Sequence, residues 1–254
     1  MKTSVKYSIV FFILCINLFT TQAFSEEYLW EKRVYLATFP RSGNHWARAL
    51  IEEASHIATG AVYKDAKPVH LDTVFPWGGF STDHGYIGNC RYPNIGEPVV
   101  VKTHYPTNKT PYDLLPSIKI IRIIRHPVDS MYSYYVFLHP NVPKGSPIPL
   151  DTLKRYVRKW DKHLNYWDEQ KNVVTIYYED LYNEPEKNLR KIMDATGYKV
   201  TDEDIKRAVS MNPPEGGLLK HIENYSKDDL KLINKKLGHQ MRKHGYKIPK
   251  RLVK

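Results

Sequence analysis

The sequence predicts a single α/β domain, residues 30–250, with three layers: an open, mostly parallel sheet covered by helices on both faces. Runs dominated by β-branched residues, such as residues 118–124, are typical of parallel strands that are buried on both sides. Amphipathic, helix-like stretches separate these runs, as connections between parallel strands require. Each run ends in polar residues, and open parallel sheets bind ligands beyond the carboxyl ends of their strands. We therefore expect a ligand site at that edge of the sheet.

The first 23 residues look like a secretory signal peptide rather than a part of the domain. Lys2 and Lys6 precede an apolar run at residues 9–19, and residues 21–23 offer a cleavage site. The run is shorter than the about 20 residues that a membrane-spanning helix needs. We expect a cleaved signal and a location in the secretory pathway, with an uncleaved membrane anchor as the alternative.

Beyond the signal, the chain has a large excess of positive charge. The whole sequence carries +11, and without residues 1–23 it keeps 36 Lys and Arg against 27 Asp and Glu, or +9. This charge indicates an anionic partner, such as a phosphate-bearing cofactor, an acidic glycan, a nucleic acid or a membrane surface. The basic residues are spread along the chain without interleaved aromatics, so we expect no nucleic acid partner.

Two glycosylation sequons and the cysteines fit the secretory route. The sequons are Asn108-Lys109-Thr110 and Asn224-Tyr225-Ser226, and Pro111 makes the first a poorer acceptor. Cys15 lies in the signal, which leaves Cys90 without a partner for a disulfide within the mature chain. We therefore predict that Cys90 is a buried or idle thiol.

The first strand, predicted at residues 34–39, leads through the polar turn Pro40-Arg41-Ser42-Gly43 into a helix predicted at residues 46–58. Such a turn leaves backbone N–H groups unpaired at the positive end of the helix, where they bind anions. Gly43 lets the backbone approach a ligand, and Arg41 and Ser42 add hydrogen bonds. The turn has one glycine and lacks a closing Lys-Ser/Thr, so it differs from the nucleotide-binding P-loop. We predict a phosphate-binding loop.

Two further strands end in chemically active residues. The strand at residues 98–101 leads into Lys102-Thr103-His104-Tyr105-Pro106, and the strand at 118–124 leads into Arg125-His126-Pro127-Val128-Asp129. Before them, residues 60–97 carry glycines, prolines, histidines and aromatics without a period, and Gly60 suits the end of the preceding helix. We expect this irregular segment to form a wall of the ligand site that recognises the substrate.

The second half of the chain reads mainly as helices. We expect a helix at residues 129–137, a proline-rich rim or gate at 138–150, and a long amphipathic helix with apolar residues at Leu150, Leu153, Val157, Trp160, Leu164 and Trp167. A fourth strand at 173–178 ends in Tyr178-Glu179-Asp180, whose acids anchor the loop rather than form a catalytic pair. Later helices are marked by Pro185 at a start, Gly197 at a stop, capping boxes at residues 201–204 and 226–229, and the apolar stripe Leu230, Ile233, Leu237 and Met241.

Three motifs in order along the chain, TFPRSGNHW, VKTHYP and RHPVDSMYSYYVF, resemble those of the sulfotransferases that use 3′-phosphoadenosine 5′-phosphosulfate (PAPS). The cytosolic members carry similar TYPKSGTTW and KTHLP motifs, and an Arg and a Ser spaced as Arg125 and Ser133 are here. The resemblance spans residues 34–197. An ordered match of three motifs is far more specific than any one of them.

The resemblance implies a role for each residue of the site. Residues of the P-loop-like segment would hold the 5′-phosphosulfate: Arg41, Ser42, Gly43, Asn44, His45 and Trp46. Arg125 and Ser133 would bind the 3′-phosphate, and Trp46 and Tyr178 would hold the adenine. The chain lacks the family's C-terminal Arg-Lys-Gly lid, and Lys220, in residues 213–220, is the candidate replacement.

The resemblance also implies the chemistry. His104 would be the general base, while Lys102 and Arg41 would stabilise charge during direct, in-line transfer without a metal. The acceptor would be a hydroxyl of a glycan, a glycolipid or a secreted small molecule. The alternative is a secreted polyanion-binding protein without catalysis. A kinase is disfavoured by the missing Lys-Ser/Thr and the absence of a metal-binding carboxylate.

Overall fold

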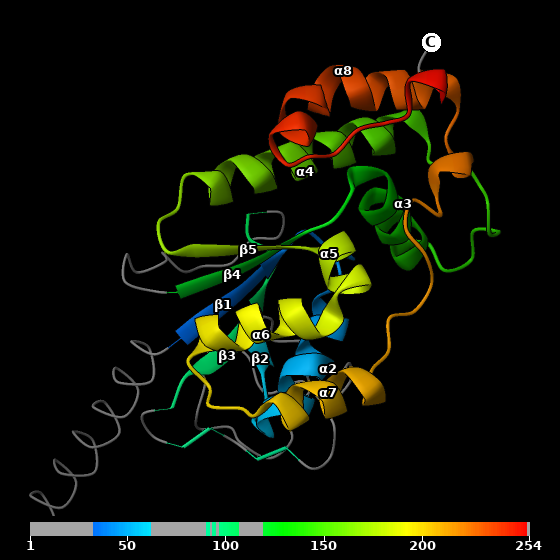
Figure 1. The fold of residues 1–254 in the computed structure, drawn as a ribbon. Coiled ribbons are helices and arrows are strands. Elements are labelled where there is room, and N and C mark those ends of the chain that lie inside the picture. The colour runs from blue at the N-terminus through cyan, green and yellow to red at the C-terminus, as the bar shows by residue number, and fades with distance from the viewer. Residues whose placement is uncertain (1–32, 62–89, 92, 95–96, 107–118, 253–254) are drawn as a thin grey trace, which may run out of the picture.

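The structure is a computed structural model that describes residues 33–61, 90–91, 93–94, 97–106 and 119–252. Its centre is one parallel sheet in the order β2-β3-β1-β4-β5 (Figure 1). The strands are β1 (Arg33–Thr38), β2 (Gly60–Ala61), β3 (Val99–Thr103), β4 (Lys119–Ile124) and β5 (Val173–Tyr177). Four of these strands confirm the predicted runs within one or two residues at each end.

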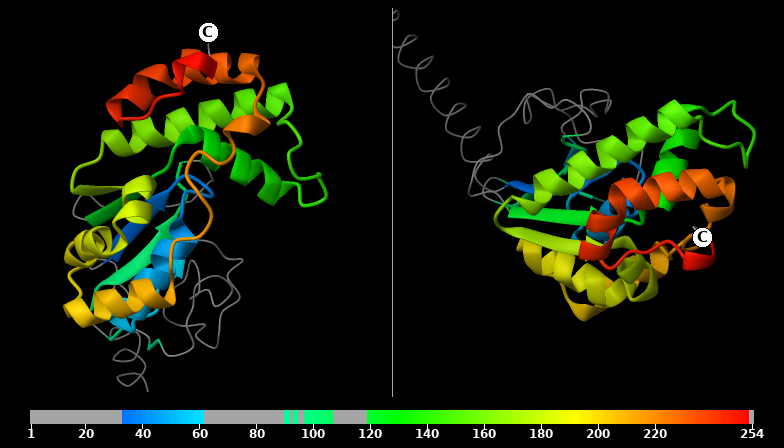
Figure 2. Two further views of the ribbon diagram at one scale, coloured as in Figure 1. Left: turned by 45° about the vertical axis from the view of Figure 1, so that its right-hand side comes forward. Right: turned by 90° about the horizontal axis from the view of Figure 1, so that it is seen from above.

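Helices cover both faces of the sheet, as predicted. One face is covered by α2 (Asn44–Ser55), α5 (Tyr178–Asn183), α6 (Pro185–Thr196) and α7 (Asp202–Met211). The long helix α4 (Leu150–Asp168) lies on the other face, with α8 (Lys227–Lys243) running alongside it (Figure 2). Helix α3 (Pro127–Leu138) packs with α4 and α8 beyond the carboxyl end of the sheet.

The strands send alternate side chains into two different cores, which explains why β1 is buried along its whole length. Val34 and Leu36 face the side of α2, α6 and α7, where they pack with residues such as Ile51 and Ile192. Tyr35 and Ala37 face the opposite side, with Trp167 of α4. Burial of both faces requires apolar residues at successive positions, and this requirement is the signal that the sequence carried.

One predicted helix end is wrong. Helix α2 ends at Ser55, because His56 adopts a left-handed conformation (φ 54°) and its N–H bonds to the Glu52 carbonyl. Gly60 therefore does not terminate the helix. It lies in β2, a two-residue strand that the sequence analysis did not anticipate, and pairs with Val101 of β3.

The predicted signals of the later helices are confirmed. Pro185 begins α6, and Gly197 ends it with a φ of 81°. Thr201 and Ser226 each form a capping box with the aspartate three residues later. The apolar stripe of α8 is buried. Glu179 does anchor neighbouring structure, since its carboxylate accepts hydrogen bonds from the His126 N–H and the Tyr246 hydroxyl.

Some predictions fall outside the described residues. The signal peptide at residues 1–23, the sequon at Asn108 and most of the irregular segment 60–97 belong to this group. Cys90 is described and is buried, as predicted. Across the described ranges, we find no helix with the length and apolar character needed to cross a membrane.

Candidate active site

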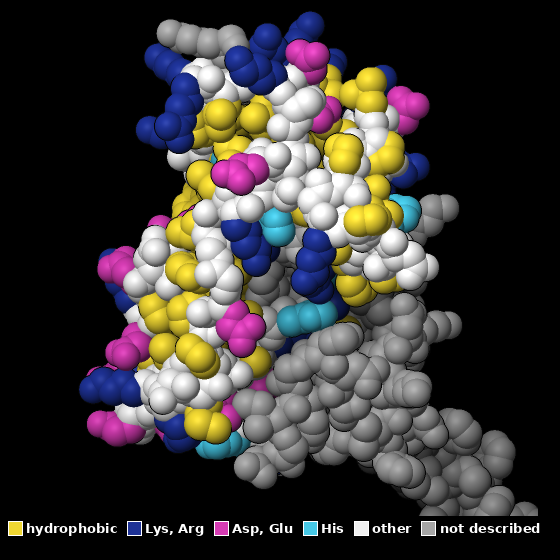
Figure 3. Space-filling model, turned by 90° about the vertical axis from the view of Figure 1, so that its right-hand side faces the viewer, with side chains coloured by type: hydrophobic (Ala, Val, Ile, Leu, Met, Phe, Trp, Pro, Cys, Tyr) yellow, Lys and Arg dark blue, Asp and Glu magenta, His cyan; other side chains and the backbone are white. Residues whose placement is uncertain are grey.

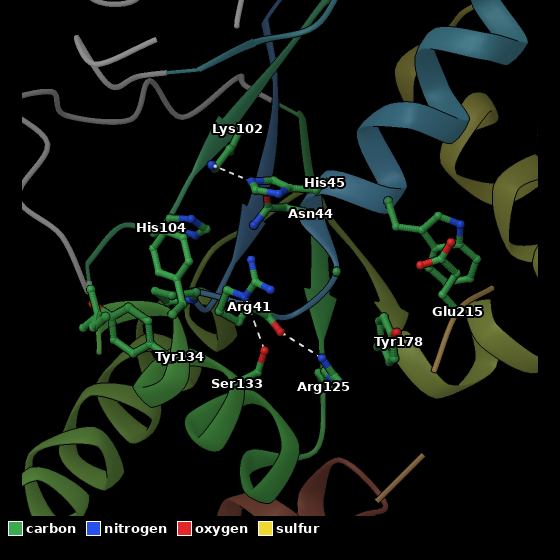
Figure 4. Close-up of a pocket in the computed structure, with 15 residues that line it drawn as sticks. Arg41, Asn44, His45, Lys102, His104, Arg125, Ser133, Tyr134, Tyr178 and Glu215 are labelled. Atoms are coloured by element: carbon green, nitrogen blue, oxygen red, sulfur yellow. Dashed lines mark hydrogen bonds between the residues drawn. The ribbon is translucent and has the colours of Figure 1, made fainter. Parts of the chain in front are cut away.

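The carboxyl ends of three neighbouring strands open into one pocket of about 410 Å³, a volume typical of small-molecule sites. In Figure 3, Lys, Arg and His side chains gather around a hollow near the centre of this face of the molecule. All of the predicted site residues line the pocket except Ser42 and Lys220. The segments after β1, β3 and β4 therefore meet at the carboxyl edge of the sheet, where the sequence predicted a ligand site. Figure 4 shows Arg41, His104 and Arg125 around the same space.

The loop between β1 and α2 is fixed by backbone geometry. Gly43 is the residue before α2 and has a φ of 96°, and a Cβ there would lie 2.5 Å from the Tyr178 ring. Only glycine fits this position without strain. The Ser42 N–H bonds to the Phe39 carbonyl at 3.2 Å and closes the turn, while the Ser42 hydroxyl is buried without a hydrogen-bond partner. Ser42 is thus a core residue of the loop rather than part of the pocket wall.

Arg125 ties the first motif to the third. Its Nη1 donates to the Arg41 carbonyl at 3.0 Å, and its guanidinium carbon lies 4.3 Å from the centre of the Tyr178 ring. Nε of Arg125 is buried and has no hydrogen-bond partner. Arg41 in turn donates from Nε to the Ser133 hydroxyl at 3.3 Å. Burial, and then the charge of Arg125, lower the pKa of Arg41, as expected for two cations that share one pocket.

Asp129 is a functional candidate that the sequence analysis gave no role. Its carboxylate, fully buried, accepts hydrogen bonds from the backbone N–H of Leu219 (2.7 Å) and His221 (3.1 Å) and lies 3.8 Å from Nη2 of Arg125. Asp129 therefore holds in place both Arg125 in the pocket and the segment that follows α7. The clue in the sequence was its position four residues after Arg125, although its backbone partners lie about 90 residues further on.

The segment after α7 presents an acid rather than a base to the pocket. Glu215 lines the pocket, whereas the exposed Lys220 does not. Nζ of Lys220 lies instead against Gly216, where a Cβ would be only 2.7 Å away. The sequence gave no signal for Glu215, because the side chain that faces inward depends on the path of the chain after α7, which includes left-handed residues at Gly216 (φ 84°) and Leu219 (φ 53°).

His104 has a defined tautomer. Its Nδ1 lies 2.8 Å from the Thr38 carbonyl oxygen and 3.1 Å from the Thr38 hydroxyl, which also accepts a hydrogen bond from Asn44 at 3.2 Å. A carbonyl can only accept, so Nδ1 carries the proton and Nε2 carries the lone pair. Burial, and then the charge of Lys102, lower the pKa of His104 to about 3. The imidazole is therefore neutral at physiological pH with its lone pair on Nε2, and a pKa this low makes it a weak base unless negative charge offsets the effects of burial and Lys102.

Lys102 of β3 and His45 of the first turn of α2 meet at the edge of the pocket. Nζ of Lys102 lies 3.4 Å from Nε2 of His45, and both residues line the pocket (Figure 4). An ammonium group can only donate, so this His45 nitrogen is the acceptor. The contact directs the positive charge of Lys102 towards the phosphate-binding loop.

Trp46 and Tyr178 form an aromatic extension of the pocket. The indole N–H of Trp46 donates to the Asn212 carbonyl at 2.9 Å, and its ring meets the Tyr178 ring edge-to-face at 5.8 Å. Both residues also line a second pocket of about 230 Å³, together with Met211, Asn212, Pro213 and Glu215. A space with two aromatic side chains in its wall suits a planar ring such as a purine.

The chemistry of the pocket fits a nucleotide with several negative charges. Arg41, Lys102 and Arg125 supply positive charge, and the buried Nε of Arg125 is a donor without a partner. Glu215 is the only acidic side chain among the described residues that line it. In the described part of the chain, no cluster of three or more His, Cys, Asp or Glu is placed to hold a metal ion. Transfer without a metal stays a prediction.

Comparison with known proteins identifies the family. The model of the sulfotransferase domain matches residues 31–244. Rat sulfotransferase 2A6 is 28% identical over 214 residues, which cover 80% of this chain and 72% of the rat protein. Bovine sulfotransferase 1E1 is 26% identical over 222 residues, 82% of this chain and 73% of the bovine protein.

Solved structures share the fold. A mouse sulfotransferase, SULT7A1, complexed with PAP superposes with a TM-score of 0.56 at 19% identity, covering 86% of this chain and 90% of the mouse chain. Retinol dehydratase in complex with androsterone and the inactive cofactor PAP also gives 0.56, at 17% identity and with 87% and 83% covered. The matches of the domain, of its relatives and of the fold agree with the three motifs. The chain therefore belongs to the family of sulfotransferases that use PAPS.

Proposed function

We propose that this enzyme transfers the sulfuryl group of PAPS directly and in line to an acceptor hydroxyl, with His104 as the general base. One observation carries this proposal: a neutral imidazole of defined tautomer shares one pocket with Arg41, Lys102 and Arg125. An imidazole that can accept a proton serves the acceptor hydroxyl, and the cations serve the anionic donor. A site that only bound polyanions would have no need of the imidazole.

The residues of the pocket suit the two charged ends of the donor. Arg125, whose Nε has no protein partner, and Ser133 would bind the 3′-phosphate. The loop around Gly43 would bind the 5′-phosphosulfate through its backbone N–H groups. Trp46 and Tyr178 would contact the adenine. Two solved structures of the same fold carry PAP, which supports this assignment.

Once bound, the donor supplies an activated sulfuryl group. Nε2 of His104 takes the proton of the acceptor hydroxyl while the new oxygen–sulfur bond forms and the bridging oxygen–sulfur bond breaks. Lys102 neutralises the negative charge that develops on the bridging oxygen, and Arg41 does the same at the sulfuryl oxygens. Negative charge in the pocket would oppose the effect of Lys102 and raise the low pKa of His104 when the donor is present.

The proposed acceptor and compartment rest on the N-terminal segment of the sequence. With residues 1–23 as a signal peptide, or as an uncleaved anchor, the enzyme would act in the secretory pathway on a glycan, a glycolipid or a secreted small molecule. Expression in eukaryotic cells tests this by N-terminal sequencing and by the mobility shift after glycosidase treatment. An N-terminus at Met1 in a cytosolic, unglycosylated product would contradict it.

The activity is tested with PAP and with labelled donor. We expect PAP to raise the melting temperature, because a ligand that binds only the folded state stabilises it, whereas ATP or heparin should not do so to the same extent. Labelled PAPS should then transfer sulfate to acceptor hydroxyls. Stabilisation by heparin but not by PAP would favour the alternative, a secreted polyanion-binding protein.

A further inference from the structure

One side of helix α4 carries a row of basic residues beside the pocket. Arg155, Lys159, Lys162 and Tyr166 follow each other at spacings of four, three and four residues, so they lie on the same side of the helix. We name Arg155, Lys159 and Lys162 the α4 basic edge. Lys159 is partly buried, and the other two are exposed.

The α4 basic edge approaches the pocket through Lys159, on the side of the proposed base. Nζ of Lys159 lies 5.9 Å from the ring centre of Tyr134, which lines the pocket. At the other end of the row, Tyr166 packs against Tyr105 with ring centres 4.7 Å apart. Tyr105 is the residue directly after His104, so the row runs alongside the segment that carries the base.

If His104 is the base, as proposed above, its side of the pocket is the acceptor side. Figure 4 shows Tyr134 and His104 on one side of the pocket and Tyr178 and Glu215 on the other, with Arg41 between them. The residues proposed to hold the adenine are on the far side. The positive charge of Lys159, which lies next to Tyr134, is therefore placed to meet the acceptor rather than the adenine.

Within the described residues, no acid neutralises Lys159 or Arg155. Other cations nearby are paired: Lys154 with Asp151 at 3.3 Å, and Arg122 with Asp168 at 2.6 Å. Arg155 and Lys159 are instead like charges one helical turn apart, an arrangement that destabilises a helix. Burial, and then the charge of Arg155, lower the pKa of Lys159. A bound anion would relieve this repulsion.

We propose that the α4 basic edge binds a carboxylate or sulfate group of the acceptor, so that the enzyme sulfates hydroxyls of molecules that are already acidic. Saccharides with uronate or sulfate groups, and phenols with a carboxylate, share this chemistry. This inference rests on the proposed function, because it assigns the acceptor to the side of His104. It fits the strongly basic composition of the chain.

The test is the binding of matched probes to the full chain loaded with PAP. Chondroitin sulfate tetrasaccharide carries carboxylates and sulfates, chitotetraose is neutral, and 4-hydroxyphenylacetate distinguishes a small phenolic anion from a saccharide. We expect the wild type to prefer an anionic probe and Arg155→Gln/Lys159→Gln to weaken that binding by about tenfold, as the loss of two partly screened charges would. The control Lys231→Gln/Lys235→Gln removes the same charge from the exposed side of α8.

Two results would overturn the inference: no preference of the wild type for either anionic probe, or equal weakening in both double variants. PAP affinity should be the same in all three proteins. Failure of PAP to bind the wild type would instead count against the proposed function, so the two failures are distinguishable.

Discussion

Replacing Gly43 with alanine should weaken nucleotide binding through a residue that bears no functional group. Gly43 has a φ of 96°, and a Cβ there would lie 2.5 Å from Cδ2 of Tyr178. A left-handed conformation costs a residue with a side chain about 1–2 kcal/mol. Overpacking adds about 1–3 kcal/mol. We therefore expect the free energy of unfolding to fall by about 2–5 kcal/mol.

The effect on binding comes from the movement that the new methyl group forces on Tyr178. The ring of Tyr178 lies 4.3 Å from the guanidinium carbon of Arg125, the proposed 3′-phosphate ligand. A cation–π contact of this kind is worth about 0.5–2 kcal/mol, so the Kd for PAP should rise about 2- to 30-fold.

Isothermal titration with PAP and urea unfolding measure the two effects. Gly217→Ala is the matched control, because a Cβ at Gly217 meets no atom within 4 Å and its φ is not positive. Wild-type affinity in Gly43→Ala, or the same loss in Gly217→Ala, would show that the close approach of loop and ring does not shape the site.

Two further predictions concern buried charge. Asp129→Asn should lower the free energy of unfolding by about 1–3 kcal/mol and weaken PAP binding, because one of its two backbone N–H partners would face an amide N–H; urea unfolding at wild-type stability would refute this. Burial lowers the pKa of His104 and His163 to about 3 and of His126 to about 4. As the pH falls below 6.5, these three histidines bind protons in the unfolded chain but not in the folded one, and the folded state loses stability. Burial raises the pKa of Glu52 to about 7, which has the opposite effect between pH 4.5 and 7 and offsets one histidine. Urea unfolding should therefore show stability falling between pH 6.5 and 4.5, each histidine contributing at most about 1.4 kcal/mol per pH unit; constant or rising stability on acidification would contradict this.

The sheet and the convergence of its strand ends were predictable because both depend on local signals. Strands β1 and β4 are buried on both faces, so each needs successive apolar residues, and this pattern is visible in the sequence. Topology rules then place the ends of adjacent parallel strands together, which correctly located Arg41, His104 and Arg125.

The missed features depend on contacts between distant segments. Gly60 looks like a helix stop in the sequence, and only the neighbouring strand β3 makes it a strand residue. Asp129 was visible, but its bonds to Leu219 and His221 depend on the path of the chain after α7. The same path turns Glu215 rather than Lys220 towards the pocket. Local propensity says nothing about such a path.

The most direct test of the account separates nucleotide binding from proton transfer. PAP affinity and single-turnover transfer from labelled PAPS would be measured for the wild type, His104→Ala and Arg125→Ala. We predict that His104→Ala binds PAP with nearly wild-type affinity while its transfer rate falls by about 10²-fold or more, and that Arg125→Ala loses most of its affinity. Wild-type transfer by His104→Ala, or unchanged PAP affinity in Arg125→Ala, would contradict the claim that the three strand ends form one sulfuryl-transfer site.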